Sequence, residues 1–72
     1  MRVTLDKSVD AAFIYLTDDK IDFGFMYECD EHVIGDMINL EFAKDGRLVG
    51  IEVMGASHRL PVSYLEQAEV IG

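Results

Sequence analysis

The sequence predicts an α+β fold: a small, mainly antiparallel β-sheet of four or five strands in hairpins or a meander, with a short C-terminal helix packed on one face. Three observations indicate this fold. Runs rich in β-branched and aromatic residues alternate with closely spaced turn signals, an Asp-Gly pair separates two alternating runs, and a helix-start pattern occurs near residue 63. The 72 residues, half of them hydrophobic, predict a single domain spanning residues 1–72.

The N-terminal half predicts three strands. Residues 3–5 form a short strand, and residues 6–10 are rich in turn formers. Residues 11–17 are apolar on both faces, as is usual for a central strand. Residues 21–27 alternate, which places Ile21, Phe23, Phe25 and Tyr27 on one face of a half-buried strand. Residues 28–36 are polar and predict no regular element.

Residues 37–43 and 48–54 predict a hairpin around Asp45-Gly46. We expect a two-residue type I′ loop, because Asp-Gly suits a turn that needs positive φ at both central positions. The resulting register pairs Phe42 with Val49, Leu40 with Ile51 and Ile38 with Val53 on one face, and Asn39 with Glu52 and Glu41 with Gly50 on the other. Gly50, inside a strand, indicates a bulge or a close backbone approach.

The C-terminal segment predicts the helix. Ser63 and Glu66 have the spacing of a capping box, in which each side chain accepts a hydrogen bond from the other residue's backbone amide. Leu65 and Ala68 provide a narrow apolar stripe, so we expect a helix over residues 64–70. A helix this short is unstable alone in water and must dock on the sheet.

The net charge of −8 is unevenly distributed. Seven acidic residues and one lysine lie between residues 18 and 36, giving that segment a charge of −6. An acidic chain repels phosphates, so we expect neither direct nucleic-acid binding nor a membrane surface as partner. Two interpretations of the acidic segment remain open: a solvated face that maintains solubility, or a docking surface for a basic protein partner.

The sequence also predicts a cytoplasmic protein that self-associates. No secretory signal pattern or long apolar run occurs, and the lone Cys29 cannot form an internal disulfide. Domains of this size usually need a disulfide, a metal or oligomerisation for stability. Oligomerisation is the option left, and we expect a homodimer that buries an apolar sheet face.

Two segments resemble a known family. DAAFIYL, residues 10–16, is similar to its first motif, and KDGRLVGIEVMGAS, residues 44–57, is similar to its second. The run HRLP at residues 58–61 resembles the family's usual ending. The family is domain of unknown function 2283, which groups small prokaryotic proteins. The resemblance implies a small α+β fold without assigned catalytic residues, and neighbouring toxin-like proteins of some members imply an antitoxin-type binding role.

Three groups of residues are candidate sites. Cys29 and His32, with His58, provide too few ligands for a structural zinc site. Ser57 and His58 are adjacent and point to opposite faces of an extended strand, which separates a nucleophile from its base. Glu41 and Glu52 lie near each other in the predicted hairpin, but the sequence provides no pocket around them. We therefore predict no catalytic, cofactor-binding or metal-binding residue, and no cofactor.

The function expected from these observations is protein–protein interaction. The chain either self-associates or captures a basic partner in the manner of an antitoxin. The alternative is a small-ligand-binding protein or a minor enzyme that uses carboxylates such as Glu41 and Glu52. A concave pocket with perturbed titratable groups favours the alternative, and an exposed apolar patch rimmed by charge favours the interaction module.

Overall fold

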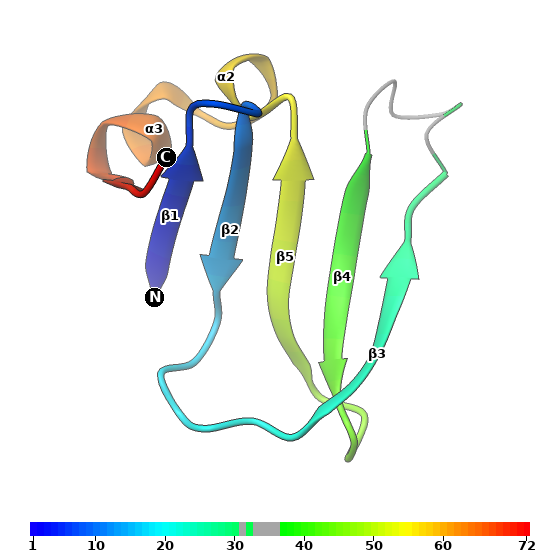
Figure 1. Ribbon diagram of the computed structural model, residues 1–72. Coiled ribbons are helices and arrows are strands. Elements are labelled where there is room, and N and C mark those ends of the chain that lie inside the picture. The colour runs from blue at the N-terminus through cyan, green and yellow to red at the C-terminus, as the bar shows by residue number, and fades with distance from the viewer. Residues whose placement is uncertain (31, 33–36) are drawn as a thin grey trace.

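A computed structural model describes residues 1–30, 32 and 37–72 of the chain. The described part forms a six-stranded mixed sheet with two short helices at one end (Figure 1). The strands are β1 (Arg2–Asp6), β2 (Ala11–Tyr15), β3 (Phe23–Glu28), β4 (Ile38–Ala43), β5 (Leu48–Met54) and β6 (Glu69–Val70). The helices are α2 (Ala56–Arg59) and α3 (Val62–Gln67). Across the sheet the strand order is β3-β4-β5-β2-β1-β6.

The α+β class is confirmed, and the described sheet is mainly antiparallel as predicted, with one parallel pair between β1 and β6. The predicted number of strands is wrong, because the described sheet has six strands and not four or five. The sixth strand arises because α3 ends at Gln67. Ala68 then adopts an extended conformation, which brings Glu69 and Val70 beside the outer edge of β1. The predicted helix over residues 64–70 is therefore shifted toward the N-terminus.

The predicted capping box does not form. Pro61 occupies the N-cap of α3 in an extended conformation, no side chain caps the helix, and Ser63 lies inside the first turn. The fixed φ of proline suits the residue that leads into a helix, so the helix begins at Val62. The preceding helix α2, a single turn, was not predicted because residues 56–59 carry no apolar periodicity.

The β4–β5 hairpin has the predicted register over most of its length, but its turn differs. Ile38 pairs with Val53, Leu40 with Ile51, and Glu41 with Gly50. The loop has three residues, 44–46, because the amide of Ala43 bonds the carbonyl of Arg47. Gly46 has a φ of +90°, whereas Asp45 is not in the positive-φ region. A type I′ turn is therefore wrong, and the geometry is that of a three-residue hairpin with glycine in the left-handed position.

A bulge at Val49 reconciles the longer turn with the predicted pairing. Phe42 pairs with Leu48 and not with Val49, and the register shifts between Phe42 and Glu41. The turn adds one residue to the loop, and the bulge then places one extra residue in β5. The two shifts cancel, so the side chains from Gly50 onward face the partners that the sequence predicts.

β2 occupies the interior position predicted for it. It pairs antiparallel with β1 on one side and with β5 on the other. The sheet is therefore not a simple meander. The chain leaves β2 and passes below the ends of β5 and β4 before it enters β3 at the far edge (Figure 1).

The buried core lies between the sheet and the helices. Leu5, Ala12 and Ala56 are buried together, and Leu60, Leu65 and Ala68 pack against them. Both helices gather at the end of the sheet formed by β1, β2 and the end of β5 (Figure 1). No helix in the described part of the chain is long and apolar enough to cross a membrane.

Asp10 joins the β1–β2 turn to the start of α2. Its carbonyl accepts a hydrogen bond from the amide of Ala56, and its carboxylate accepts one from the amide of Ser57 at 3.0 Å and one from Ser57 Oγ at 2.7 Å. Asp10 has a φ of +50°, a region that aspartate tolerates better than most residues. Its side chain thus provides the cap that α2 lacks from its own N-cap residue, Gly55.

Replacing Gly46 tests the turn. We expect Gly46→Val to lower the free energy of unfolding by about 1–3 kcal/mol, because a β-branched residue is strained at positive φ. Apart from the adjacent residues of the chain, no atom lies within 4 Å of a Cβ added at this position, so backbone strain is the only expected cause of the lost stability. Gly46→Asn is the control, since asparagine tolerates the left-handed region and loses less stability. Chemical denaturation measures both, and an unchanged midpoint for Gly46→Val contradicts the turn assignment.

Replacing Asp10 tests the link to α2. Asp10→Ala removes both carboxylate hydrogen bonds and leaves alanine at a positive φ. We expect a loss of about 1 kcal/mol or more in the free energy of unfolding, as for the loss of a helix cap. Ser57→Ala removes one of the two bonds and costs less. Lys7→Ala, exposed in the same turn, is the control, and equal midpoints for Asp10→Ala and Lys7→Ala contradict the proposed cap.

Candidate functional site

The two faces of the sheet differ in chemistry. Side chains alternate along each strand, so Leu5 and Ala12 define a helix-bearing face, and their neighbours Thr4 and Phe13 define an open face. Cross-strand pairing extends the open face through Glu52 and Asn39 to β3. The open face therefore combines aromatic rings with carboxylates, and no described helix covers it.

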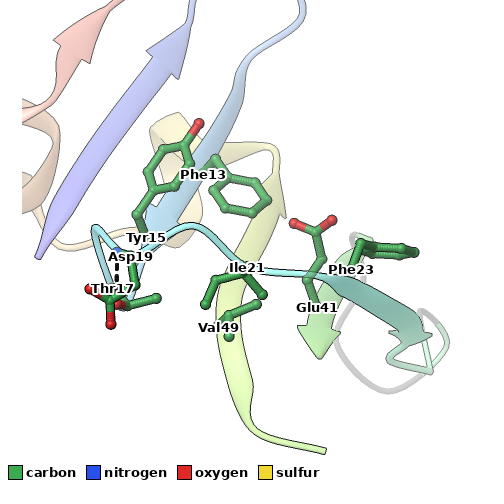
Figure 2. Close-up of a pocket in the computed structure, with 8 residues that line it drawn as sticks. All are labelled: Phe13, Tyr15, Thr17, Asp19, Ile21, Phe23, Glu41 and Val49. Carbon is green, nitrogen blue, oxygen red and sulfur yellow. Dashed lines mark hydrogen bonds between the residues drawn. The ribbon is translucent and has the colours of Figure 1, made fainter. Parts of the chain in front are cut away.

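A hollow of about 240 Å³ lies on this open face (Figure 2). Its lining combines aromatic and aliphatic side chains with two carboxylates and two hydroxyls: Phe13, Tyr15, Thr17, Asp19, Ile21, Phe23, Glu41 and Val49. We call it the aromatic–acidic hollow. Figure 2 shows the Glu41 carboxylate rising from β4 between the rings of Phe13 and Phe23. The site is thus concave, largely apolar, and carries a few polar groups, as ligand sites do.

The segment between β2 and β3 forms one wall of the hollow. Thr17 Oγ1 accepts a hydrogen bond from the amide of Asp19 at 3.1 Å, a local turn that starts the crossing (Figure 2). The carbonyl of Asp22 accepts one from the amide of Lys44 at 3.0 Å, which fixes the far end. Ile21, predicted to begin a strand, lies in this segment, and β3 begins at Phe23. The segment between β2 and β3 therefore places Asp19 and Ile21 beside the hollow on the open face.

A bulge at Gly24 directs Phe23 into the hollow. Phe23 pairs with Ala43 and Phe25 with Phe42, so the register shifts between them. Phe25 consequently stacks on Phe42 on the helix-bearing face, with ring centroids 4.8 Å apart. The prediction that Phe23 and Phe25 share a face is therefore wrong. Glycine is needed here because an added Cβ would lie 2.6 Å from the carbonyl oxygen of Ala43.

Gly50 supports the floor of the hollow. The ring of Phe13 lies over Gly50, where an added Cβ would be 2.5 Å from Phe13 Cζ. The expected close approach at Gly50 is thus confirmed, and the bulge occurs beside it, at Val49. Phe13 and Tyr15 then lie with their ring centroids 4.5 Å apart at an angle of 50°, a favourable tilted arrangement.

Glu41 and Glu52 lie on the open face, as predicted, but line different hollows. Glu41 lines the aromatic–acidic hollow, and Glu52 lines a neighbouring depression beyond Phe13. Asn39 Nδ2 donates a hydrogen bond of 2.8 Å to Glu52 Oε1. The Oδ1 atom of buried Asn39 has no hydrogen-bond partner among the described residues. This part of the sheet is therefore richer in acceptors than in donors.

The surroundings of Glu41 disfavour its charge. Burial raises the pKa of the Glu41 carboxyl, and the negative charge of Glu52 raises this pKa further. No lysine, arginine or histidine among the described residues forms an ion pair with Glu41. A cation placed in the hollow would reverse both effects, because it would satisfy the carboxylate and stack against aromatic faces.

A cation already lies against one of these rings. The Arg2 guanidinium carbon is 4.2 Å from the centroid of the Tyr15 ring. Arg2 is exposed at the start of β1, on the open face and next to Tyr15 in the sheet. Tyr15 thus lines the hollow and already takes part in a cation–π contact within the chain.

The other candidate residues do not assemble into a site in the described structure. Cys29 is a half-buried free thiol, and the amide of exposed His32 donates to Asp30 Oδ1 at 2.9 Å. Glu31, which lies between Asp30 and His32 in the sequence, is outside the described residues. Among the residues described, no three His, Cys, Asp or Glu side chains are grouped as metal ligands. Ser57 Oγ donates to Asp10 and so has a structural role in capping α2.

The acidic segment predicted over residues 18–36 falls partly outside the described structure, which omits residues 31 and 33–36. Of its described members, Asp19 contributes to the hollow. The aromatic members of the site, Phe13, Tyr15 and Phe23, were not predicted as functional. Gly24 in the middle of an alternating strand was the available signal, since an isolated glycine in a strand favours a bulge.

The fold and the hollow define a small α+β domain with a mixed sheet that is open on one face. The chain belongs to the family described as "Protein of unknown function (DUF2283)", whose model matches residues 2–57. The matched segment includes β1 to β5 and ends at Ser57, before the HRLP run. Comparisons with curated proteins and with solved structures found no match.

The raised pKa of Glu41 predicts a pH-dependent difference in stability. The folded protein binds a proton at Glu41 more readily than the unfolded chain, so this carboxyl favours folding at low pH. That contribution is lost as the pH rises from the ordinary glutamate pKa through the folded-state pKa. Glu41→Gln resembles the protonated form. We expect it to gain stability relative to the wild type as the pH rises, with a plateau at neutral pH.

Urea denaturation between pH 3 and pH 8 measures this difference. Glu66→Gln, an exposed position on α3, is the matched control and should follow the wild type throughout. A difference between Glu41→Gln and wild type that does not change with pH would contradict the assigned burial of the Glu41 charge.

Proposed function

We propose that this protein is a small binding module that captures a basic protein partner by inserting one of its lysine or arginine side chains into the aromatic–acidic hollow. The observation that carries this proposal is the position of Glu41. Its carboxylate lies between aromatic rings, with a raised pKa and no cationic partner among the described residues. An unpaired, partly buried carboxylate costs free energy, and a ligand cation recovers that cost.

The hollow has the chemistry that a cationic side chain requires. Phe13 and Phe23 flank Glu41 and offer aromatic surfaces to the methylene stem, while the Glu41 carboxylate offers a charge-assisted hydrogen bond to the head group. The net charge of −8 adds a long-range attraction that raises the rate of encounter with a basic protein. This combination supports a basic protein as partner, in line with the antitoxin-type role that the family resemblance implies.

An enzymatic use of Glu41 and Glu52 is the less supported alternative. The two carboxylates line different hollows, and Asn39 already donates to Glu52. A small amine is the other alternative ligand, since it would use the same rings and the same carboxylate. The experiment below therefore includes a free polyamine alongside the blocked amino acids.

Amide chemical-shift titration tests the proposal. The probes are N-acetyl-lysine methylamide, N-acetyl-arginine methylamide, the side-chain-acetylated form of the lysine probe, and spermidine. We expect the two cationic amino acids to shift the amides of β2, β4 and residues 17–23, and the neutral acetylated probe to shift none of them. Glu41→Gln should weaken binding roughly tenfold, because a hydrogen bond to a charged group is lost.

Glu66→Gln is the matched control because it removes the same charge from an exposed site away from the hollow. The site would be refuted if both variants bound the probes equally weakly. It would also be refuted if the chemical-shift changes were spread over the acidic surface and did not include the hollow, because only net charge would then be recognised. Tighter binding of spermidine than of either blocked amino acid would refute a protein partner in favour of a small amine.

A further inference from the structure

Charge is separated between the two faces of the sheet. The charged residues of the six strands are Arg2, Asp6, Glu28, Glu41, Glu52 and Glu69, and strand alternation and pairing place all of them on the open face. Strand positions on the helix-bearing face hold only apolar residues and Tyr27. A monomer in water gains nothing from keeping a whole face free of charge unless that face is covered.

The helices cover only one end of this uncharged face. Leu5 and Ala12 are buried beneath α2 and α3, and Val53 is also buried. Toward the other edge the cover ends, and Phe25 and Tyr27 on β3 are 53% and 58% exposed. Figure 1 shows no described helix near β3 or β4. We call the uncovered part the β3–β5 apolar face, formed by Phe25, Tyr27, Leu40, Phe42, Leu48 and Ile51.

We infer that the β3–β5 apolar face binds a second copy of this chain, in a twofold dimer whose aromatic–acidic hollows face outward. Two copies that meet through this face bury apolar side chains against apolar side chains and desolvate no strand charge. Stacked Phe25 and Phe42 form a broad, rigid aromatic surface at its centre. The interface lies on the side opposite the hollow and is independent of the ligand proposed for it.

The distribution of charge favours a second copy over a different partner. A basic protein would be attracted to the open face, where the strand carboxylates lie, and not to a face without charge. Two copies each carry a charge of −8, but the strand charges lie on the open faces, which point away from the interface. Sheets that pack face to face lie about 10 Å apart, so the two sets of strand charges are separated by more than the Debye length of about 8 Å at physiological salt.

The uncovered face fits a small interface. Phe25 and Tyr27 are more than half exposed, and Leu40, Phe42 and Ile51 are half-buried. A standard interface buries roughly 800 Å² on each partner, so a dimer through this face belongs at the small end of specific interfaces. Twofold symmetry is the simplest closed arrangement, because the same patch then serves on both copies.

Sedimentation equilibrium of the full chain tests the inference. We expect the wild type to have twice the 8.1 kDa monomer mass at micromolar concentration, in both low and high salt. Tyr27→Lys should weaken dimerisation at least tenfold, because it places a charge in the interface. Met26→Lys is the matched control: the neighbouring residue on β3 receives the same charge but faces the open side, so the dimer should persist.

Leu48→Lys provides a second test at a distant part of the same face, and circular dichroism establishes that each variant is folded. A wild-type monomer in both buffers would overturn the inference. Equal dissociation by Tyr27→Lys and Met26→Lys would overturn the assigned face, as would a dimer that persists in both Tyr27→Lys and Leu48→Lys. Retained binding of the lysine probe by monomeric Tyr27→Lys would support the independence of the two surfaces.

Discussion

The pairing of β2 with β5 is the interaction on which the rest of the structure depends. It joins two units that are local in sequence, the β1–β2 hairpin and the β3–β4–β5 segment, by pairing Ala11 with Met54 and Tyr15 with Gly50. Pairing residues this far apart in the chain costs loop-closure entropy, which side-chain contacts must offset. Gly50 makes this possible on the open face, because its missing side chain leaves room for the Phe13 ring.

The β2–β5 pairing positions residues on both faces of the sheet. On the helix-bearing face it sets Ala12 beside Val53 and brings the end of β5 next to the β1–β2 turn, where Asp10 caps α2. On the open face it aligns Phe13 and Tyr15 with Glu41 across Gly50. The buried core and the hollow are therefore two results of one register, and a shift of that register by one residue would exchange the faces.

Features that depend on residues close together in the chain can be predicted from the sequence. Apolar or alternating runs between turn signals identified the five longer strands, and the Ile38–Val53 and Leu40–Ile51 pairs follow from matching the apolar positions of two strands. The bulges at Gly24 and Val49 were not predicted in place, since each depends on tertiary contacts that alternation does not encode. The hollow was missed for the same reason: Phe23 reaches it only through the Gly24 bulge, and Asp19 only through the crossing from β2 to β3.

In the C-terminal segment the predicted helix bounds were wrong for a different reason. Ser63 and Glu66 have the right spacing for a capping box, yet Pro61 begins the helix and the sheet edge ends it. β1 would otherwise leave its outer hydrogen-bonding groups unpaired, and two residues of β6 are enough to cover part of that edge. Local helix propensity explains why a helix forms in this region. The pairing of Glu69 and Val70 with the edge of β1 explains why that helix ends at Gln67.

The two proposed surfaces place opposite demands on the same sheet. A cation-binding hollow holds the Glu41 carboxylate against aromatic rings, and the burial of its charge costs stability until a ligand cation neutralises it. A dimer interface requires a face without charge, and alternation supplies it by placing each strand carboxylate on the opposite side. Dimerisation would also double the negative charge presented to a basic partner and display two hollows in opposite directions. Stability gained by dimerisation through the uncharged face would offset the cost of the Glu41 charge on the open one, which matters in a chain of 72 residues because small domains bury a smaller fraction of their surface on folding.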